Sequence, residues 1–115
     1  MRIEIKGRNG VVVGEDLRER LHKRLDKLGR QVSPLAQCDV EFSEERNPSI
    51  ADSQIAEITL RLKGTTLRAR NASSSMSHAL NLALDELTRQ VRRHSEKKRG
   101  RRVSTKAEPN AAGLQ

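Results

Sequence analysis

Aromatic residues are almost absent from this sequence of 115 residues, which contains one phenylalanine, Phe42, and no tryptophan or tyrosine. Proteins that read unstacked bases usually offer several aromatic side chains on which the bases stack. This chain cannot build such a platform. If it binds nucleic acid, we therefore expect contacts with phosphates, 2′-hydroxyls and helix shape.

Cysteine and long apolar runs are also scarce. The single cysteine, Cys38, excludes an internal disulfide. No run of about 18 apolar residues is present that could form a membrane span. The N-terminal residues MRIEIKGR alternate charged and apolar side chains and lack the apolar centre of a signal peptide. These absences together predict a cytoplasmic protein.

Residue groups typical of enzymes are missing as well. Glu44, Glu45 and Asp52 flank a loop without a nearby histidine or cysteine, so catalysis by paired carboxylates is a weak hypothesis. No phosphate-binding loop of the GxxxxGK type occurs. We expect no catalytic residues, no metal and no cofactor. The possible nitrogen and sulfur ligands show no metal-site spacing; they are His22, Cys38, His78 and His94.

Positive charge is plentiful and unevenly distributed. The chain has 23 lysines and arginines against 15 acids, a formal net charge of +8. Residues 89–106 contain nine of these cations and one acid, Glu96, whereas the other 97 residues contain 14 of each sign. The sequence therefore describes a neutral domain with one strongly positive end. Such a one-sided field predicts a polyanionic partner.

Hydrophobic periodicity predicts six elements in the order β-α-β-β-β-α. Apolar residues alternate in four segments, 2–7, 37–45, 56–63 and 67–70, which predicts strands. They recur at helical spacing over residues 14–29 and from 76 to about 98, which predicts two helices. Gly29 is expected just after the first helix, and the second is expected to end near Gly100. Gly64-Thr65 predicts a tight hairpin turn with glycine first.

The predicted elements favour an α+β fold. Each helix has one apolar stripe and the strands share one apolar face, so we expect a four-stranded sheet with two helices packed on one face. Residues 1–98 would form this domain. Residues 99–115 contain few large apolar side chains and would form a disordered basic tail or linker. Double-stranded RNA-binding domains are similar, although they normally lack the first strand.

Several short motifs occur in the same order as in a known family. The first strand ends in Gly7-Arg8, the first helix contains Leu17-Arg18-Glu19 and Lys27-Leu28, and a three-strand meander follows. The last helix contains Met76, Leu87, Arg89-Gln90, His94 and Glu96-Lys97. Through this set, residues 1–98 resemble the ribosome hibernation promoting factors, or ribosome-associated inhibitors. Ser75 and Ser77 depart from the pattern, since many members have an acid and a tyrosine there.

The resemblance implies a ribosome-associated translation inhibitor that is not an enzyme. Its expected partner is the small ribosomal subunit, bound through 16S rRNA in the mRNA and tRNA channel, which keeps ribosomes inactive during stress or stationary phase. No membrane or small-molecule substrate is expected. Long members add a C-terminal dimerisation domain that nothing after Arg99 could form, so we expect a monomeric short form or a long form cut in its linker. The expected rRNA-binding residues, including Lys98 from the basic run, are Lys23, Lys27, Arg89, Arg92, Arg93, Lys97 and Lys98.

Simpler explanations exist for many of these cations. Asp85 is placed to pair with Arg89, and Glu19 with Lys23, at the i,i+4 spacing of a helix. Cross-strand pairs with Glu41 or Glu57 would explain some cations of the loops and the outer sheet face; these are Arg8, Arg61, Lys63, Arg68 and Arg70. Two other functions stay open: a double-stranded RNA-binding module without preference for ribosomes, and a nuclease or RNA-modifying enzyme.

Overall fold

The computed structural model describes the backbone of residues 1–47 and 49–106 and the side chains of residues 1–47 and 49–97. It confirms the predicted order β-α-β-β-β-α. The elements are β1 (Arg2–Gly7), α1 (Glu15–Gly29), β2 (Gln37–Glu44), β3 (Gln54–Leu62), β4 (Thr65–Ser73) and α2 (Met76–Lys106).

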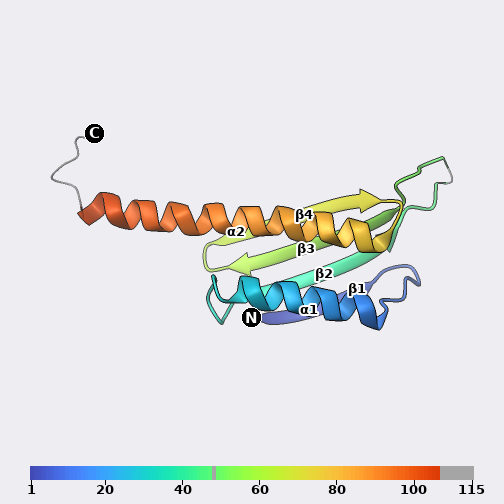
Figure 1. The fold of residues 1–115 in the computed structure, drawn as a ribbon, viewed down its shortest axis with the longest axis horizontal. Helices are drawn as coiled ribbons and strands as arrows, with labels where there is room; N and C mark the ends of the chain where they lie inside the picture. The colour runs from blue at the N-terminus through green and yellow to red at the C-terminus, as the bar shows by residue number, and fades with distance from the viewer. Residues whose placement is uncertain (48, 107–115) are drawn as a thin grey trace.

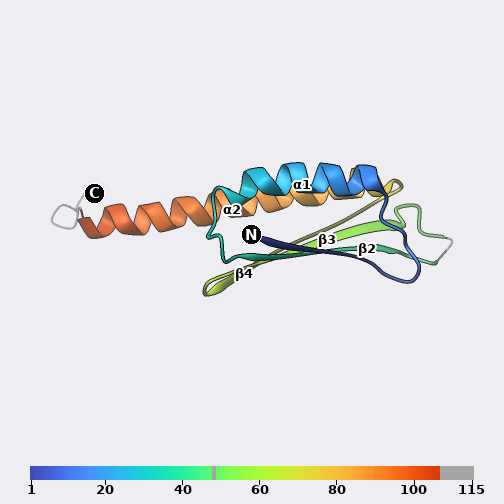
Figure 2. The ribbon, with the colours of Figure 1, turned by 90° about the horizontal axis from the view of Figure 1, so that it is seen from below.

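The four strands form one sheet in the order β1-β2-β3-β4. β1 pairs in parallel with β2, with α1 as the crossover between them, and β2, β3 and β4 form an antiparallel meander. α1 lies over β1 and β2, and α2 lies over β3 and β4 (Figure 1). Both helices cover the same face of the sheet (Figure 2), so the predicted α+β arrangement is confirmed and the other face is left open.

The core lies between the helices and the sheet. Alternation along β2 buries Cys38, Val40 and Phe42, and the matching face of β3 contributes Ile58 and Leu60. The helices close this layer with their apolar stripes, which are Leu21, Leu25 and Leu28 on α1 and Leu80, Leu84, Leu87 and Val91 on α2. Because these stripes set the rotation of each helix about its axis, they also determine which polar residues face away from the sheet.

The end of α2 differs from the prediction. The helix continues through Lys106, so the expected end near Gly100 is wrong, and residues 99–106 of the predicted disordered tail are helical. One glycine inside a helix costs only about 1 kcal/mol relative to alanine, and the surrounding lysines and arginines are good helix formers. The domain boundary after residue 98 stays a prediction, and residues 107–115 lie outside the described residues. This end of α2 extends beyond α1 and the sheet (Figure 1).

Two glycines also take other roles than predicted. Gly29 is the last residue of α1, and the C-cap is Arg30 in a right-handed conformation, so no left-handed glycine ends this helix. At the β3–β4 hairpin, Leu62 pairs with Thr65, which leaves Lys63-Gly64 as the loop. Gly64 is therefore second in the turn, with a φ of 77° that suits glycine.

Gly7, at the end of β1, is required by a close backbone approach. A Cβ atom added there would lie 2.0 Å from the carbonyl oxygen of Val11. We expect Gly7→Ala to lower the free energy of unfolding by about 2–4 kcal/mol, because the backbone must move to relieve the overlap. Urea unfolding measures this. Gly14→Ser, at a position with open space before α1, is the control and should change stability by a few tenths of a kcal/mol.

Candidate nucleic-acid interface

Polar contacts connect α1 to α2 along their outer sides. Arg20 bonds to Ser77 near the start of both helices. About one turn further along α1, and two to three turns further along α2, Arg24 Nη2 donates to Asp85 Oδ1 at 2.9 Å and to Thr88 Oγ1 at 3.5 Å. Residue numbers rise in the same direction along both helices from one contact to the next, so α1 and α2 run parallel, as Figure 1 also shows. Their side chains therefore form one continuous surface.

The Arg24–Asp85 ion pair replaces a predicted one. The sequence predicts that Asp85 pairs with Arg89 on its own helix, but Asp85 lies 2.9 Å from Arg24 of α1. The only local indication was that Arg24 borders the apolar stripe, directly before Leu25. The pair engages the acid that would have neutralised Arg89, and it links the two helices at their surface.

Four of the predicted binding residues lie on the side of the helix pair that faces away from the sheet. Lys23 and Lys27 are exposed on α1, and Arg89 and Arg92 are exposed on α2. Within residues 1–47 and 49–97, no acid forms an ion pair with any of the four. Lys27 and Arg92 each lie one turn beyond the Arg24–Thr88 contact, at adjoining places on the two helices. We call this surface the helix face, defined by Lys23, Lys27, Arg89 and Arg92.

Arg93 and Lys97 point in a different direction. They lie about 40° and 80° round α2 from Arg89, on the side away from Arg92. There they line a groove between α2 and the first residues of β4. We call it the edge groove, lined by Thr65, Leu67, Gln90, Arg93, His94, Glu96 and Lys97. The predicted set of binding residues is thus divided between two surfaces, and the side chain of Lys98 lies outside the described residues.

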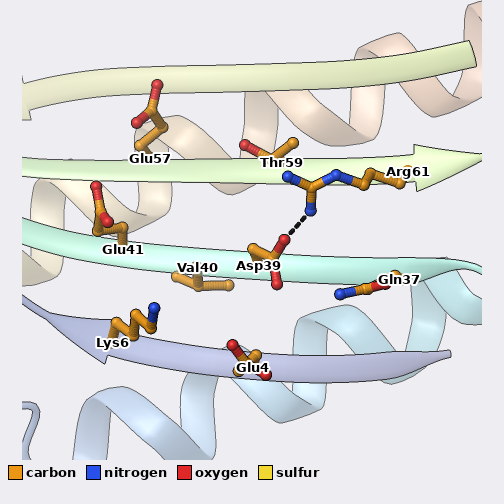
Figure 3. A pocket seen from close by; sticks show the side chains of 9 residues that line it. All are labelled: Glu4, Lys6, Gln37, Asp39, Val40, Glu41, Glu57, Thr59 and Arg61. Atoms are coloured by element: carbon orange, nitrogen blue, oxygen red, sulfur yellow. Dashed lines mark hydrogen bonds and ion pairs between the residues drawn. The ribbon is translucent and has the colours of Figure 1, made fainter.

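The open face of the sheet has a different charge pattern (Figure 3). Glu41 and Glu57 lie directly opposite each other on β2 and β3, and Glu4 lies beside Asp39. Arg61 is bonded to Asp39. Lys6 lies among the four carboxylates as well, so the centre of this face has mixed charge. The open face therefore lacks the uninterrupted positive charge of the helix face.

The prediction that some cations of the loops and this face form cross-strand pairs with Glu41 or Glu57 is correct in part. Arg8 pairs with Glu41 at 3.5 Å, as predicted, whereas Arg61 pairs with Asp39 rather than with Glu41 or Glu57. Arg70 is the register neighbour of Glu57. No ion pair of Lys63 or Arg68 occurs among the side chains that the structure describes.

The possible catalytic and metal-binding residues are dispersed. His78 Nδ1 lies 2.7 Å from Ser73 Oγ at the start of α2, and Glu44 accepts a bond from Gln54 at 2.6 Å. Across residues 1–47 and 49–106, no group of three or more histidines, cysteines or acids is placed to hold a metal ion. In the same residues, no helix combines the length and the apolar character needed to cross a membrane.

Cys38 is a core residue, as its strand pattern predicts. It is fully buried, and this burial raises the pKa of its thiol from an ordinary value of 9.0 to about 11. Between these two pKa values the folded protein therefore keeps the thiol proton, whereas the unfolded chain has lost it. Between about pH 9 and 11, stability should fall by about 1.4 kcal/mol per pH unit on account of this thiol.

The test of this pH dependence is a comparison with Cys38→Ala. Urea unfolding of both proteins across this range should give stabilities that converge as the pH rises, because the variant lacks the thiol. Parallel curves would contradict the assignment.

Solved structures define the fold class. A ribosomal subunit interface protein from Coxiella burnetii matches with a TM-score of 0.67 at 22% identity, over 84% of this chain and 99% of its own. The N-terminal domain of Thermus thermophilus Protein Y matches with a TM-score of 0.66 at 27% identity, over 82% of this chain and 99% of its own. The fold of this chain is therefore the fold of these proteins.

The family follows from the sequence comparison. A family model described as Sigma 54 modulation protein / S30EA ribosomal protein matches residues 3–99, and the chain belongs to this family. A ribosome hibernation promotion factor of Picosynechococcus sp. is 30% identical over 104 residues, which are 90% of this chain and 53% of the relative. The chain thus spans about half the length of this curated relative. The predicted resemblance to hibernation promoting factors is confirmed.

Proposed function

We propose that this protein binds the small ribosomal subunit through 16S rRNA and keeps ribosomes inactive. The observation that carries the proposal is the helix face: four exposed cations on two parallel helices, without an ion pair to any acid of residues 1–47 and 49–97. Its relatives are named a ribosome hibernation promotion factor and a ribosomal subunit interface protein. The name of the first relative supports a ribosomal partner, and the cations would supply the means of contact with its RNA.

The mechanism would be occupation of a site rather than catalysis. Cations on the helix face neutralise rRNA phosphates and release counterions, which supplies affinity that falls steeply with salt. Its one Phe, Tyr or Trp residue, Phe42, is buried, so the chain has no exposed platform of such rings on which bases could stack. The protein would therefore recognise the shape and charge of folded rRNA, and would inhibit translation because it fills the mRNA and tRNA channel.

A sedimentation experiment tests this proposal. The protein is mixed with purified small subunits, large subunits or a naked RNA duplex, and bound protein is measured in sucrose-gradient fractions. We expect binding to small subunits at physiological salt and displacement by mRNA with initiator tRNA. Equal binding to the naked duplex would favour the general double-stranded RNA-binding module instead, and the absence of any binding to small subunits would refute the proposal.

A further inference from the structure

The edge groove differs from the helix face in shape as well as direction. It is a hollow between α2 and the edge strand β4, whereas the helix face lies across the two helices on the side away from the sheet. Arg93 and Lys97 lie one turn apart on its α2 side, where their side chains are neighbours. Both are exposed, while Thr65 and Leu67 form a half-buried opposite wall. The groove thus combines two cations with a hydroxyl and an apolar surface.

Gln90 adds a hydrogen-bond acceptor of known orientation. Its Nε2 donates to the Arg68 carbonyl oxygen at 2.8 Å and to Glu86 Oε2 at 3.2 Å. Carbonyl and carboxylate oxygens accept hydrogen bonds, so the amide nitrogen of Gln90 faces both partners and its carbonyl oxygen faces away from them. The Oε1 atom accepts no bond from the side chains that the structure describes. Gln90 therefore brings a positioned amide to the groove, with its carbonyl oxygen available.

These features fit one strand of RNA. The two cations suit successive phosphates, and Leu67 offers an apolar surface to a ribose or base edge. An RNA 2′-hydroxyl can donate to the Gln90 carbonyl, and DNA lacks this group. A duplex carries both strands on a convex surface, which does not enter a groove between a helix and a strand. The Glu96 carboxylate also lines the groove and disfavours a phosphate beside it, so the phosphates would lie against Arg93 and Lys97.

We propose that the edge groove binds a single RNA strand by its sugar-phosphate backbone, separately from the RNA bound on the helix face. Arg93 and Lys97 contact phosphates, and Gln90 accepts a hydrogen bond from a ribose 2′-hydroxyl. This inference rests on the proposed function, since it assigns a second contact to the same class of partner. It makes the domain bivalent, with α2 inserted between two RNA segments.

Binding of a labelled uridine oligonucleotide of about 12 nucleotides, within the range of known single-strand sites, tests the groove in isolation from ribosomes. The double variant Arg93→Gln/Lys97→Gln is compared with Lys23→Gln/Lys27→Gln, which removes the same charge from exposed lysines of α1. Fluorescence anisotropy should show that the groove variant binds about tenfold more weakly, with a salt slope lowered by about 1.4. The helix-face variant should change less than about twofold. Equal weakening of both variants, or no weakening by the groove variant, would overturn the proposal.

The 2′-hydroxyl contact has its own test. Gln90→Lys keeps a donor for the Arg68 carbonyl and Glu86 and removes the acceptor. Wild-type protein should prefer the RNA oligonucleotide over its deoxy counterpart severalfold, and the variant should bind both equally, whatever its added charge does to affinity overall. An unchanged preference in the variant, or none in wild type, contradicts the assignment.

Two controls separate this inference from competing outcomes. In the first control, polyglutamate and unlabelled RNA compete with the labelled oligonucleotide. If polyglutamate displaces it as effectively as RNA does, the partner is an acidic protein and a groove specific for an RNA strand is refuted. Wild-type protein that binds the oligonucleotide through the groove but does not sediment with small subunits would refute the proposed function alone. Sedimentation with small subunits together with unchanged oligonucleotide binding by the groove variant would refute the groove alone.

Discussion

Reversing three charges on α2, in the variant Arg89→Glu/Arg92→Glu/Arg93→Glu, should abolish sedimentation with the small ribosomal subunit at physiological salt. Each cation that neutralises a phosphate contributes to counterion release, and reversal adds repulsion to the lost attraction. We expect affinity to fall by about two orders of magnitude or more, and the salt dependence of the remaining binding to become shallow. Gradient fractions quantified across several salt concentrations measure both effects.

The fold should survive these reversals. All three arginines are exposed, and none forms an ion pair with an acid among residues 1–47 and 49–97. The glutamate introduced in place of Arg89 would lie one turn from Asp85, which costs only a few tenths of a kcal/mol. Circular dichroism and the urea midpoint should therefore stay close to wild type. A loss of helicity would point to a structural role instead.

A matched control separates a local interface from total charge. Arg18→Glu/Lys63→Glu/Arg68→Glu changes net charge by the same amount at three exposed positions away from the helix face and the edge groove lining. This variant should keep most of its subunit binding. If it loses binding as fully as the α2 variant does, the attraction is a property of the whole molecule, and neither the helix face nor Arg93 of the edge groove is a specific interface.

The orientation of the α2 arginines could be predicted because it depends on local periodicity. Leu84, Leu87 and Val91 define the buried stripe, so Arg89 and Arg92 must lie outside it, and the structure places them there. The same reasoning from Leu21 and Leu25 predicts exposed lysines on α1. A helix with a single strong apolar stripe can thus be predicted from sequence, together with the direction in which its polar residues point.

The pairing of charges could not be predicted, because it depends on which helices become neighbours. Asp85 has a suitable partner four residues away in Arg89, yet it bonds to Arg24, which lies 61 residues away in sequence. The division of the cations between the helix face and the edge groove could not be predicted from the sequence either. It arises because β4 packs along one side of α2 and α1 along the other, so arginines that are adjacent in sequence reach different surroundings.

Removing the only aromatic side chain should have the largest effect on stability. Phe42 is fully buried towards the C-terminal end of β2, and its register neighbours on both sides are small, Gly7 on β1 and Ala56 on β3. The sheet therefore accommodates one large ring between two small residues. Phe42→Ala leaves a cavity that glycine and alanine cannot fill, and it should cost about 3–5 kcal/mol of unfolding free energy. Urea unfolding measures this loss, and thermal unfolding should shift down by about 15–30 °C.

The control for this variant is Leu35→Ala. Leu35 is 91% exposed, so its truncation should change stability by less than about 0.5 kcal/mol. A comparable loss in both variants would mean that the core is not organised around Phe42. A loss below about 1.5 kcal/mol in Phe42→Ala would show that neighbouring residues collapse into the space, and that the packing around the ring is not rigid.

Coupling to Ala56 provides the sharpest test of this packing. In the wild-type background Ala56→Leu should overpack the core and cost about 1–3 kcal/mol, because Ala56 is fully buried beside the ring. In the Phe42→Ala background the same leucine enters the vacated space and should recover part of the lost stability. The double-mutant cycle should therefore give a coupling energy of about 1–3 kcal/mol. Additive effects would show that the two positions do not share one packing site, and that the small residues beside Phe42 are not needed to admit the ring.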